Sequence, residues 1–185
     1  MNCIILAKGE KSKRLNMEKP FIKIKGKTLT EILLLRMDEL FEKVYIVTTE
    51  PEKFKIYQKG KREIIRDGIK KGPLGGIYIG LKNSDTTYNF VIAIDHLFIT
   101  KDLLLYMMKK ERNYEILVPK IYNNIQVLCG IYSKSILSKV KKNLEEGKHR
   151  VKEILPLVKT VFLEEDELER FGKPEILFFN MNTQK

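Results

Sequence analysis

A cluster of basic residues follows the first apolar segment of the chain and carries its strongest chemical signal. The apolar run ends at Ala7, and the loop after it contains Gly9 and the basic side chains Lys8, Lys11, Lys13, Arg14 and Lys19. Backbone N–H groups and cationic side chains gathered at the end of a strand form a site for phosphates. The loop fits neither the P-loop pattern G-x-x-x-x-G-K-[ST] nor the dinucleotide pattern G-x-G-x-x-G. The segment therefore predicts phosphate chemistry of another kind.

A single aspartate follows the most apolar stretch of the chain. Asp95 comes directly after residues 90–94, an apolar run typical of a strand buried on both faces. A carboxylate in this position is costly unless a cation compensates its charge. Mg²⁺ is commonly held by one or two carboxylates together with substrate phosphates. Asp95 is therefore either a magnesium ligand at a phosphate-transfer site or an aspartate that caps a helix or pairs with a lysine.

A glycine-rich segment and an aspartate before it follow another expected strand. Residues 72–76, Gly-Pro-Leu-Gly-Gly, place three glycines within five positions. A plain loop with Pro73 in the first turn of a helix explains the proline but not this density of glycine. Asp67 precedes Gly68 at the end of an expected strand, where it either brings a carboxylate to a pocket at the strand ends or forms an ordinary Asp-Gly turn.

The elements that position these residues follow from alternating apolar and amphipathic segments. A T-x-x-E capping box at Thr28 and Glu31 predicts the start of a helix. Strands are expected at 2–7, 21–25, 44–48, 63–66, 90–94, 115–118, 127–132, 160–163 and 176–179, and helices at 28–42, 51–58, 77–83, 102–110, 134–146 and 151–155.

This alternation predicts a three-layer α/β fold in one domain spanning 1–185. The expected sheet is Rossmann-like and mainly parallel, with helices on both faces. Ligands bind such sheets beyond the carboxyl ends of the strands. The basic loop, residues 67–76 and Asp95 are therefore expected to share one pocket.

Composition limits the partners and the compartment. The chain has 35 Lys+Arg and 24 Asp+Glu, a net charge of +11, which favours anionic partners such as nucleotides, nucleic acid or acidic lipid. A Lys/Glu-rich surface of the thermophile kind explains the same charge without a partner. Cys3 and Cys129 lie in apolar runs and are expected to be buried, reduced thiols. The apolar run 3–7 is too short for a signal peptide, so a cytoplasmic protein without a membrane segment is expected.

The basic loop resembles the opening motif L-A-G-G-x-S-x-R-M-G-x-D-K-P of the molybdenum cofactor guanylyltransferases, a family of small nucleotidyltransferases. The matching residues are Leu6, Ala7, Gly9, Ser12, Arg14, Lys19 and Pro20. One glycine of the pair is missing, the loop is one residue longer before Arg14, and Asn16 and Glu18 replace the family's Gly and Asp. Further resemblances follow in the family's order: Asp67, the G-P-L-A-G motif at 72–76, Asp95, G-x-x-R-V at 147–151 and N-x-N-T at 180–183.

The resemblance implies a nucleotide-diphospho-sugar transferase-like fold and a specific reaction. That reaction is Mg²⁺-dependent transfer of GMP from GTP to the terminal phosphate of molybdopterin or Mo-molybdopterin, with release of pyrophosphate. Transient contact with molybdenum cofactor insertion proteins is also implied. The implied catalytic residues are Arg14, Lys19 and Asp95, with Asp95 also the metal ligand. The implied nucleotide-binding residues are Leu6, Ala7, Gly9, Lys19, Asp67, Gly72, Pro73, Leu74 and Asp95, and the acceptor-binding residues are Arg150, Asn180 and Asn182.

Three alternatives stay open at this level. A cytidylyltransferase of the same fold, acting on molybdopterin, a sugar acid or an isoprenoid precursor, is one, because residues 47–50 lack the Asn that many guanylyltransferases carry there. A non-catalytic nucleic-acid-binding protein is another, although the basic residues are spread along the chain and no RNP-like motif occurs, so no nucleic-acid partner is expected. A member of the fold that has lost activity is the third, suggested by the missing Gly and by Glu18.

Overall fold

The structure, a computed structural model, describes residues 1–7 and 18–179. Gly9, Arg14, Asn180 and Asn182, which the sequence assigns to the site, lie outside the described residues.

The described chain alternates strands and helices. The helices are α1 (Leu29–Leu40), α2 (Pro51–Phe54), α3 (Gly72–Asn83), α4 (Lys101–Lys109), α5 (Leu137–Glu145), α6 (Glu165–Glu169) and α7 (Pro174–Leu177). The strands are β1 (Asn2–Leu6), β2 (Lys23–Ile24), β3 (Lys27–Thr28), β4 (Val44–Thr48), β5 (Arg62–Arg66), β6 (Tyr88–Ala93), β7 (Ile116–Ile121), β8 (Asn124–Ile125), β9 (Cys129–Ser133) and β10 (Thr160–Leu163). Short 3₁₀ turns occur at Lys19–Phe21, Lys55–Tyr57, Lys134–Ile136, Val151–Glu153 and Leu155–Leu157.

One sheet runs through the middle of the molecule. Its strand order is β10-β7-β9-β6-β1-β4-β5, and β8 adds to it by pairing with β7. Strand β1 pairs in parallel with both β4 and β6, whereas β9 lies antiparallel between β6 and β7. The mainly parallel sheet confirms the fold class expected from the sequence. Because β1, β4 and β6 run in the same direction, their carboxyl ends meet at one edge.

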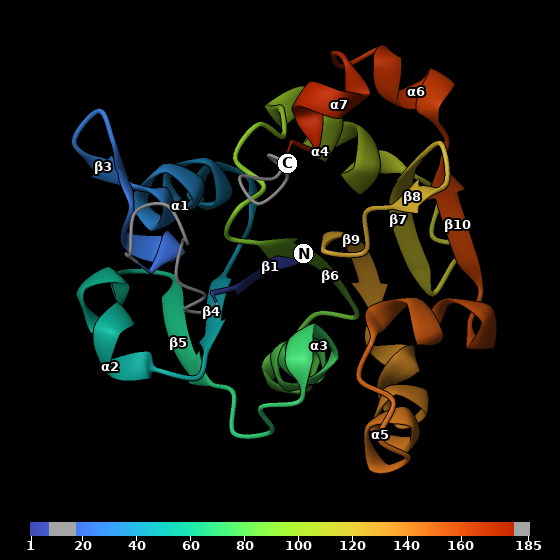
Figure 1. The fold of residues 1–185 in the computed structure, drawn as a ribbon, viewed down its shortest axis with the longest axis horizontal. Coiled ribbons are helices and arrows are strands. Elements are labelled where there is room, and N and C mark those ends of the chain that lie inside the picture. The colour runs from blue at the N-terminus through green and yellow to red at the C-terminus, as the bar shows by residue number, and fades with distance from the viewer. Residues whose placement is uncertain (8–17, 180–185) are drawn as a thin grey trace.

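Helices cover both faces of this sheet (Figure 1). Cys3 and Ile5 of β1 belong to one core cluster, which includes apolar side chains of α1, α4, α6 and α7. Ile4 and Leu6 belong to the opposite cluster, with α3 and α5. Every position of β1 is therefore buried, and this explains the unbroken apolar run at this strand.

Helix α3 lies very close to β1 because glycines form its contact face. A Cβ on Gly80 would lie 2.5 Å from Cγ2 of Ile4, and a Cβ on Gly76 would lie 3.0 Å from Cδ2 of Leu6. Residues four apart share one face of a helix. Part of the glycine density that suggested a ligand site therefore serves helix–sheet packing.

The capping box predicted for α1 is present. Thr28 Oγ1 accepts a hydrogen bond from Glu31 N at 3.1 Å, and Thr28 N donates to Glu31 Oε2 at 2.7 Å. These reciprocal bonds satisfy backbone donors that a helix start otherwise leaves unpaired.

Three predicted elements are wrong. The strand expected at 176–179 is instead helix α7 and its end, because Pro174 occupies the first turn of a helix and Leu177 and Phe178 pack into the core. The strand expected at 21–25 shrinks to the two residues of β2, which turn back into β3 through Gly26 at φ 82°. The helix expected at 151–155 forms two 3₁₀ turns instead, since Pro156 has no N–H to continue an α-helix.

The remaining sequence expectations on burial hold. Cys3 and Cys129 are fully buried free thiols, and burial raises the pKa of each. Within residues 1–7 and 18–179, no helix combines the length and the apolar character needed to span a bilayer.

Candidate active site

A pocket of about 180 Å³ opens at the carboxyl ends of β1, β4 and β6. Its walls come from these strand ends, from the start of α3 and from the segments around Lys19 and Leu128. The lining residues are Leu6, Ala7, Lys19, Val47, Thr48, Thr49, Asp67, Gly72, Pro73, Gly76, Ala93, Ile94, Asp95 and Leu128. This is the edge at which a parallel sheet is expected to bind ligand.

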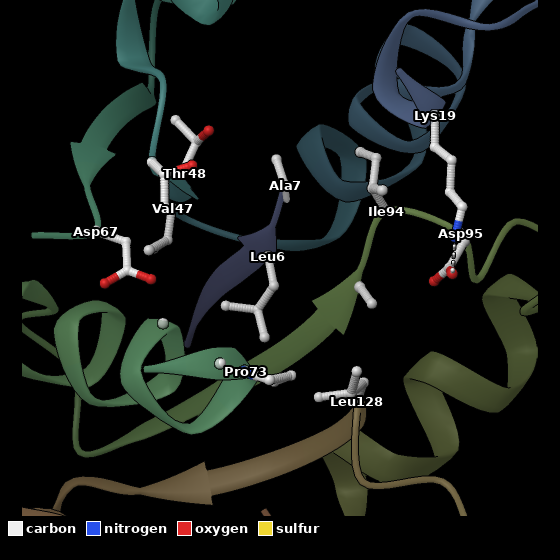
Figure 2. A pocket seen from close by; sticks show the side chains of 14 residues that line it. Leu6, Ala7, Lys19, Val47, Thr48, Asp67, Pro73, Ile94, Asp95 and Leu128 are labelled. Atoms are coloured by element: carbon white, nitrogen blue, oxygen red, sulfur yellow. Dashed lines mark ion pairs between the residues drawn. The ribbon is translucent and has the colours of Figure 1, made fainter. Parts of the chain in front are cut away.

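The pocket has two chemically different sides. Figure 2 shows Asp67 and Thr48 on one side and the Lys19–Asp95 pair on the other, with Leu6 and Ala7 between them. One side therefore offers a carboxylate and a hydroxyl beside apolar walls. The other offers an ammonium and a carboxylate. A nucleotide, which joins a flat base to a chain of phosphates, has the same two-part chemistry.

Lys19 and Asp95 form an ion pair at the other side of the pocket. Lys19 Nζ lies 4.0 Å from Asp95 Oδ2, and the two side chains are 9% and 11% exposed. Asp95 follows β6 in a turn that His96 N closes by donating to Ala93 O. Lys19 starts a 3₁₀ turn that is tied to α1, because Thr30 Oγ1 donates to Pro20 O at 2.8 Å. Rigid elements therefore hold both charges at the pocket wall.

The donor set around Asp95 is compatible with a magnesium ion held partly by substrate. No group of three or more His, Cys, Asp or Glu side chains converges within the described residues. Mg²⁺ does not require such a cage, since it is usually bound through one or two carboxylates plus substrate phosphates and water. The buried carboxylate of Asp95 can supply the protein's share of such a site.

Asp67 has two roles that the sequence treated as alternatives. Its Oδ1 accepts hydrogen bonds from Ile69 N and Lys70 N, both at 3.1 Å, so it stabilises the turn after β5. Its Oδ2 lies 4.0 Å from the point where a Cβ on Gly76 would be, at the pocket wall. One carboxylate oxygen therefore orders the loop while the other lies by the pocket.

Glu18 and His96, next in sequence to the Lys19–Asp95 pair, differ in their environments. Glu18, which replaces the family's Asp, forms an ion pair with Lys53 of α2. His96 is buried, and Nδ1 of its ring has no hydrogen-bond partner among the described residues. Burial lowers the pKa of His96, against the opposing effect of Asp95, and so favours the neutral ring. The described surroundings therefore give Glu18 a partner outside the pocket and disfavour a charge on His96.

The structure brings most of the sequence-predicted site residues together. Leu6, Ala7, Lys19, Asp67, Gly72, Pro73 and Asp95 all line the pocket. Leu74 does not, because it points into the core cluster shared with Leu6 and is 1% exposed. Gly9, Arg14, Asn180 and Asn182 lie outside the described residues.

Arg150 lies on the exposed surface rather than at the pocket wall. Its backbone N donates to Glu153 Oε2 at 2.9 Å, where it starts a 3₁₀ turn. The preceding residue contacts the start of α3, since a Cβ on Gly72 would lie 3.5 Å from His149 O. The segment expected at the acceptor thus lies beside the glycine-rich loop.

Some residues that line the pocket were not among those predicted from the sequence. Thr48, Thr49 and Ile94 could have been found, because they end or follow parallel strands that were expected correctly. Leu128 had no such signal, since it precedes the antiparallel strand β9 and reaches the pocket only through the order of strands in the sheet.

Comparison with known proteins agrees with this geometry. The model of the MobA-like NTP transferase domain matches residues 3–160. The chain belongs to this family. It is therefore a nucleotidyltransferase, as the sequence predicted. It is 33% identical to a probable molybdenum cofactor guanylyltransferase of Peptoclostridium acidaminophilum, over all of this chain and 85% of the relative, which confirms the family resemblance.

Solved structures of nucleotidyltransferases share the fold. The molybdopterin-guanine dinucleotide biosynthesis protein A of Archaeoglobus fulgidus superposes with a TM-score of 0.83 at 25% identity, covering 99% of this chain and 93% of that one. The 4-diphosphocytidyl-2C-methyl-D-erythritol synthase of Anaerococcus prevotii gives a TM-score of 0.71 at 15% identity, covering 99% and 90%. At that identity the second similarity establishes the nucleotide-diphospho-sugar transferase-like fold and nothing finer.

Proposed function

We propose that this MobA-like transferase moves GMP from GTP to the terminal phosphate of molybdopterin or Mo-molybdopterin. The observation that carries the proposal is the buried Lys19–Asp95 pair at one side of a pocket whose other side presents Asp67 and Thr48. The Lys19–Asp95 side suits phosphates, and the Asp67–Thr48 side suits a base. Full-length similarity to proteins named molybdenum cofactor guanylyltransferase supports guanine and molybdopterin over other substrates.

The proposed chemistry is a substitution at the α-phosphorus of GTP. An oxygen of the acceptor's terminal phosphate forms a new bond to that phosphorus, and the bond to the bridging oxygen of the β-phosphate breaks. Pyrophosphate leaves with the electrons of that bond. The acceptor phosphate is already ionised near neutral pH, so the step needs no general base.

Lys19 and the strand ends position the triphosphate for this step. The Lys19 ammonium lies at the pocket wall, where it stabilises charge that accumulates on the α-phosphate and the leaving pyrophosphate. Holding the reactants in line lowers the barrier further, because their translational freedom is already lost on binding. Arg14 belongs to the matched family motif and is proposed to support the same charge.

Asp95 is the residue proposed to hold Mg²⁺. Bound there with the substrate phosphates, the ion would neutralise negative charge on the transferring group. Asp95 itself contributes a carboxylate placed by the turn after β6, and Lys19 holds the opposite charge beside it.

Ligand-dependent thermal unfolding tests the nucleotide assignment. We expect GTP with Mg²⁺ to raise the melting temperature more than CTP, ATP or UTP, since a ligand that binds only the native state at a hundred times its Kd stabilises it by about 2.7 kcal/mol. A larger shift with CTP would assign the protein to the cytidylyl alternative. Transfer itself is measured as pyrophosphate released from GTP in the presence of molybdopterin, and its absence would contradict the proposed reaction.

A further inference from the structure

A second hollow lies at the same edge of the sheet as the nucleotide pocket. It measures about 290 Å³, and its lining residues are Ile121, Tyr122, Asn124, Gln126, Glu175, Phe178 and Phe179. Strand β9 is antiparallel to both β6 and β7, so β6 and β7 run the same way and their carboxyl ends lie at one edge. Figure 1 shows α7 near the loop that follows β6, and the β7–β8 hairpin farther to the right, beside β10. We call this hollow the hairpin pocket.

Two segments connect the hairpin pocket with the nucleotide pocket. The loop after Asp95 packs against the end of α7, because the ring of His96 lies 6.4 Å from that of Phe178 and the ring of Phe98 lies 5.9 Å from that of Phe179. The segment between β8 and β9 is the other. Gln126 lines the hairpin pocket, and Leu128, two residues later, lines the nucleotide pocket. The two hollows therefore lie along the same edge of the sheet, and the residue after Asp95 contacts Phe178 of the hairpin pocket.

The lining of the hairpin pocket combines aromatic rings with groups that recognise amides. Tyr122, Phe178 and Phe179 supply rings on which a flat heterocycle can stack. Asn124 and Gln126 each carry both donors and acceptors, and the carboxylate of Glu175 accepts from N–H groups. This set matches a bicyclic heterocycle that carries an amino and an oxo group on one edge, as a pterin does.

The backbone at the rim of the hairpin pocket is strained. Tyr122 starts the turn between β7 and β8 with φ 50°, a conformation that aromatic residues rarely adopt and that turns usually give to Gly or Asn. Its side chain is 69% exposed, and Tyr122 Oη donates to Glu175 Oε1 at 3.4 Å. The two-residue turn between β7 and β8 accounts for this φ, and it places Tyr122 at the rim, where its hydroxyl joins the hairpin to α7.

We propose that the hairpin pocket binds the pterin ring system of the acceptor, with its phosphate arm directed to Asp95. This inference rests on the proposed function, because it assumes a phosphorylated pterin as acceptor. It assigns the acceptor half of the site to Asn124, Gln126, Glu175 and Phe179, none of which the sequence motifs had indicated.

Matched variants test the assignment by separating acceptor binding from GTP binding. Phe179→Ala removes an exposed ring of the pocket, and Ile176→Ala removes an exposed side chain of α7 that does not line it. Asn124→Ala and Asn123→Ala form a second pair, since only the first of these neighbouring amides lines the pocket. The KM for molybdopterin and the Kd for GTP are measured for all four.

We expect Phe179→Ala to raise the KM for molybdopterin about tenfold or more, as loss of one aromatic stack under a nucleobase does. Asn124→Ala should raise it severalfold, the Kd for GTP should be unchanged, and both controls should behave as the wild type. An unchanged KM in both pocket variants, or an equal loss of GTP affinity, would overturn the inference.

A binding assay that does not depend on turnover distinguishes this inference from the proposed function. Stacking on aromatic side chains quenches the fluorescence of 6-hydroxymethylpterin, so wild-type protein should quench it saturably and Phe179→Ala should not. Quenching without any guanylyl transfer would contradict the proposed reaction and support the pocket. Transfer with equal quenching by wild type and Phe179→Ala would contradict the pocket alone.

Discussion

Lys19 Nζ lies 4.0 Å from Asp95 Oδ2, and both side chains are about nine-tenths buried although the residues are far apart in the chain. Removing two such charges from water is costly, and each offsets part of the other's cost. The pair thereby keeps opposite charges at the wall of the nucleotide pocket. Replacing either residue should therefore affect catalysis more than replacing any exposed charge.

Asp95→Asn should reduce pyrophosphate release by at least about 100-fold, because it removes the proposed metal ligand's charge while keeping its shape. The measurement is pyrophosphate formation from GTP and molybdopterin, with circular dichroism to check the fold. Asp166→Asn, on the exposed side of α6, is the matched control and should keep full activity. Near-normal turnover of Asp95→Asn would end the assignment of Asp95 as metal ligand.

Lys19→Met should slow transfer by about two orders of magnitude, as loss of one preorganised electrostatic contact does. Methionine keeps the length of the buried chain, so the packing of the 3₁₀ turn should survive. Lys23→Met removes an exposed ammonium four residues further on and is expected to change kcat little. If the two variants were equally active, the Lys19 ammonium would have no role in the transfer step.

Gly76→Ala should weaken GTP binding about tenfold. The new Cβ would lie 3.0 Å from Leu6 Cδ2 and 3.9 Å from Val47 Cγ1, and both side chains line the pocket. Overpacking of this kind costs roughly 1–3 kcal/mol and is relieved by moving the neighbours.

Gly68→Ala is the control for this glycine, because nothing lies within 4 Å of a Cβ at that position. Calorimetric titration with GTP measures both variants. Equal affinities for Gly76→Ala and wild type would show that the start of α3 does not form the wall against which the nucleotide packs.

Glu115→Gln should lower the free energy of unfolding by about 1 kcal/mol at pH 7, because hydrogen bonds to charged groups contribute about 1.5–3 kcal/mol and solvent screening reduces this at a partly exposed side chain. Glu115 Oε2 accepts from Lys159 N at 2.9 Å and Oε1 accepts from Ser135 Oγ at 3.1 Å, so the carboxylate joins the start of β10 to the segment after β9. These bonds, the one from Lys159 N first, hold the pKa of Glu115 below its ordinary value of 4.5.

The sign of the pH dependence follows from this lowered pKa. A carboxyl that is more acidic in the folded state stabilises it above its unfolded pKa and loses that effect as pH falls through the folded pKa. The difference between wild type and Glu115→Gln should thus be constant from neutral pH down to about pH 5 and shrink at more acidic pH. Urea unfolding across this range, with the exposed Glu111→Gln as control, provides the test. A difference that persisted in acid would mean that packing, not charge, is responsible.

The sequence predicted the strand ends that form the site, because local patterns are strongest where strands are buried on both faces. The apolar runs 3–7 and 90–94 are typical of strands buried on both faces, and parallel strands bring their carboxyl ends to one edge. Lys19, Asp67 and Asp95 were consequently expected in one pocket, and they line it. The capping box at Thr28 was equally local and equally clear.

Elements with weak local signals were decided by tertiary contacts. Residues 176–179 are all apolar, and a run this short does not separate strand from helix. Packing of Leu177 and Phe178 against the core selected the helix. The glycines of α3 are a second case, since only the approach of the helix to Ile4 and Leu6 shows that they also serve packing.

The sequence by itself determined the fold class, the family and the charged side of the nucleotide pocket. Only the tertiary structure placed Leu128 in that pocket and gathered Asn124, Gln126, Glu175 and Phe179 into a second one. The physical reason is sequence separation. The hairpin and α7 are brought together by the order of strands in the sheet and by core packing, and neither leaves a periodic pattern in the residues that line the hollow.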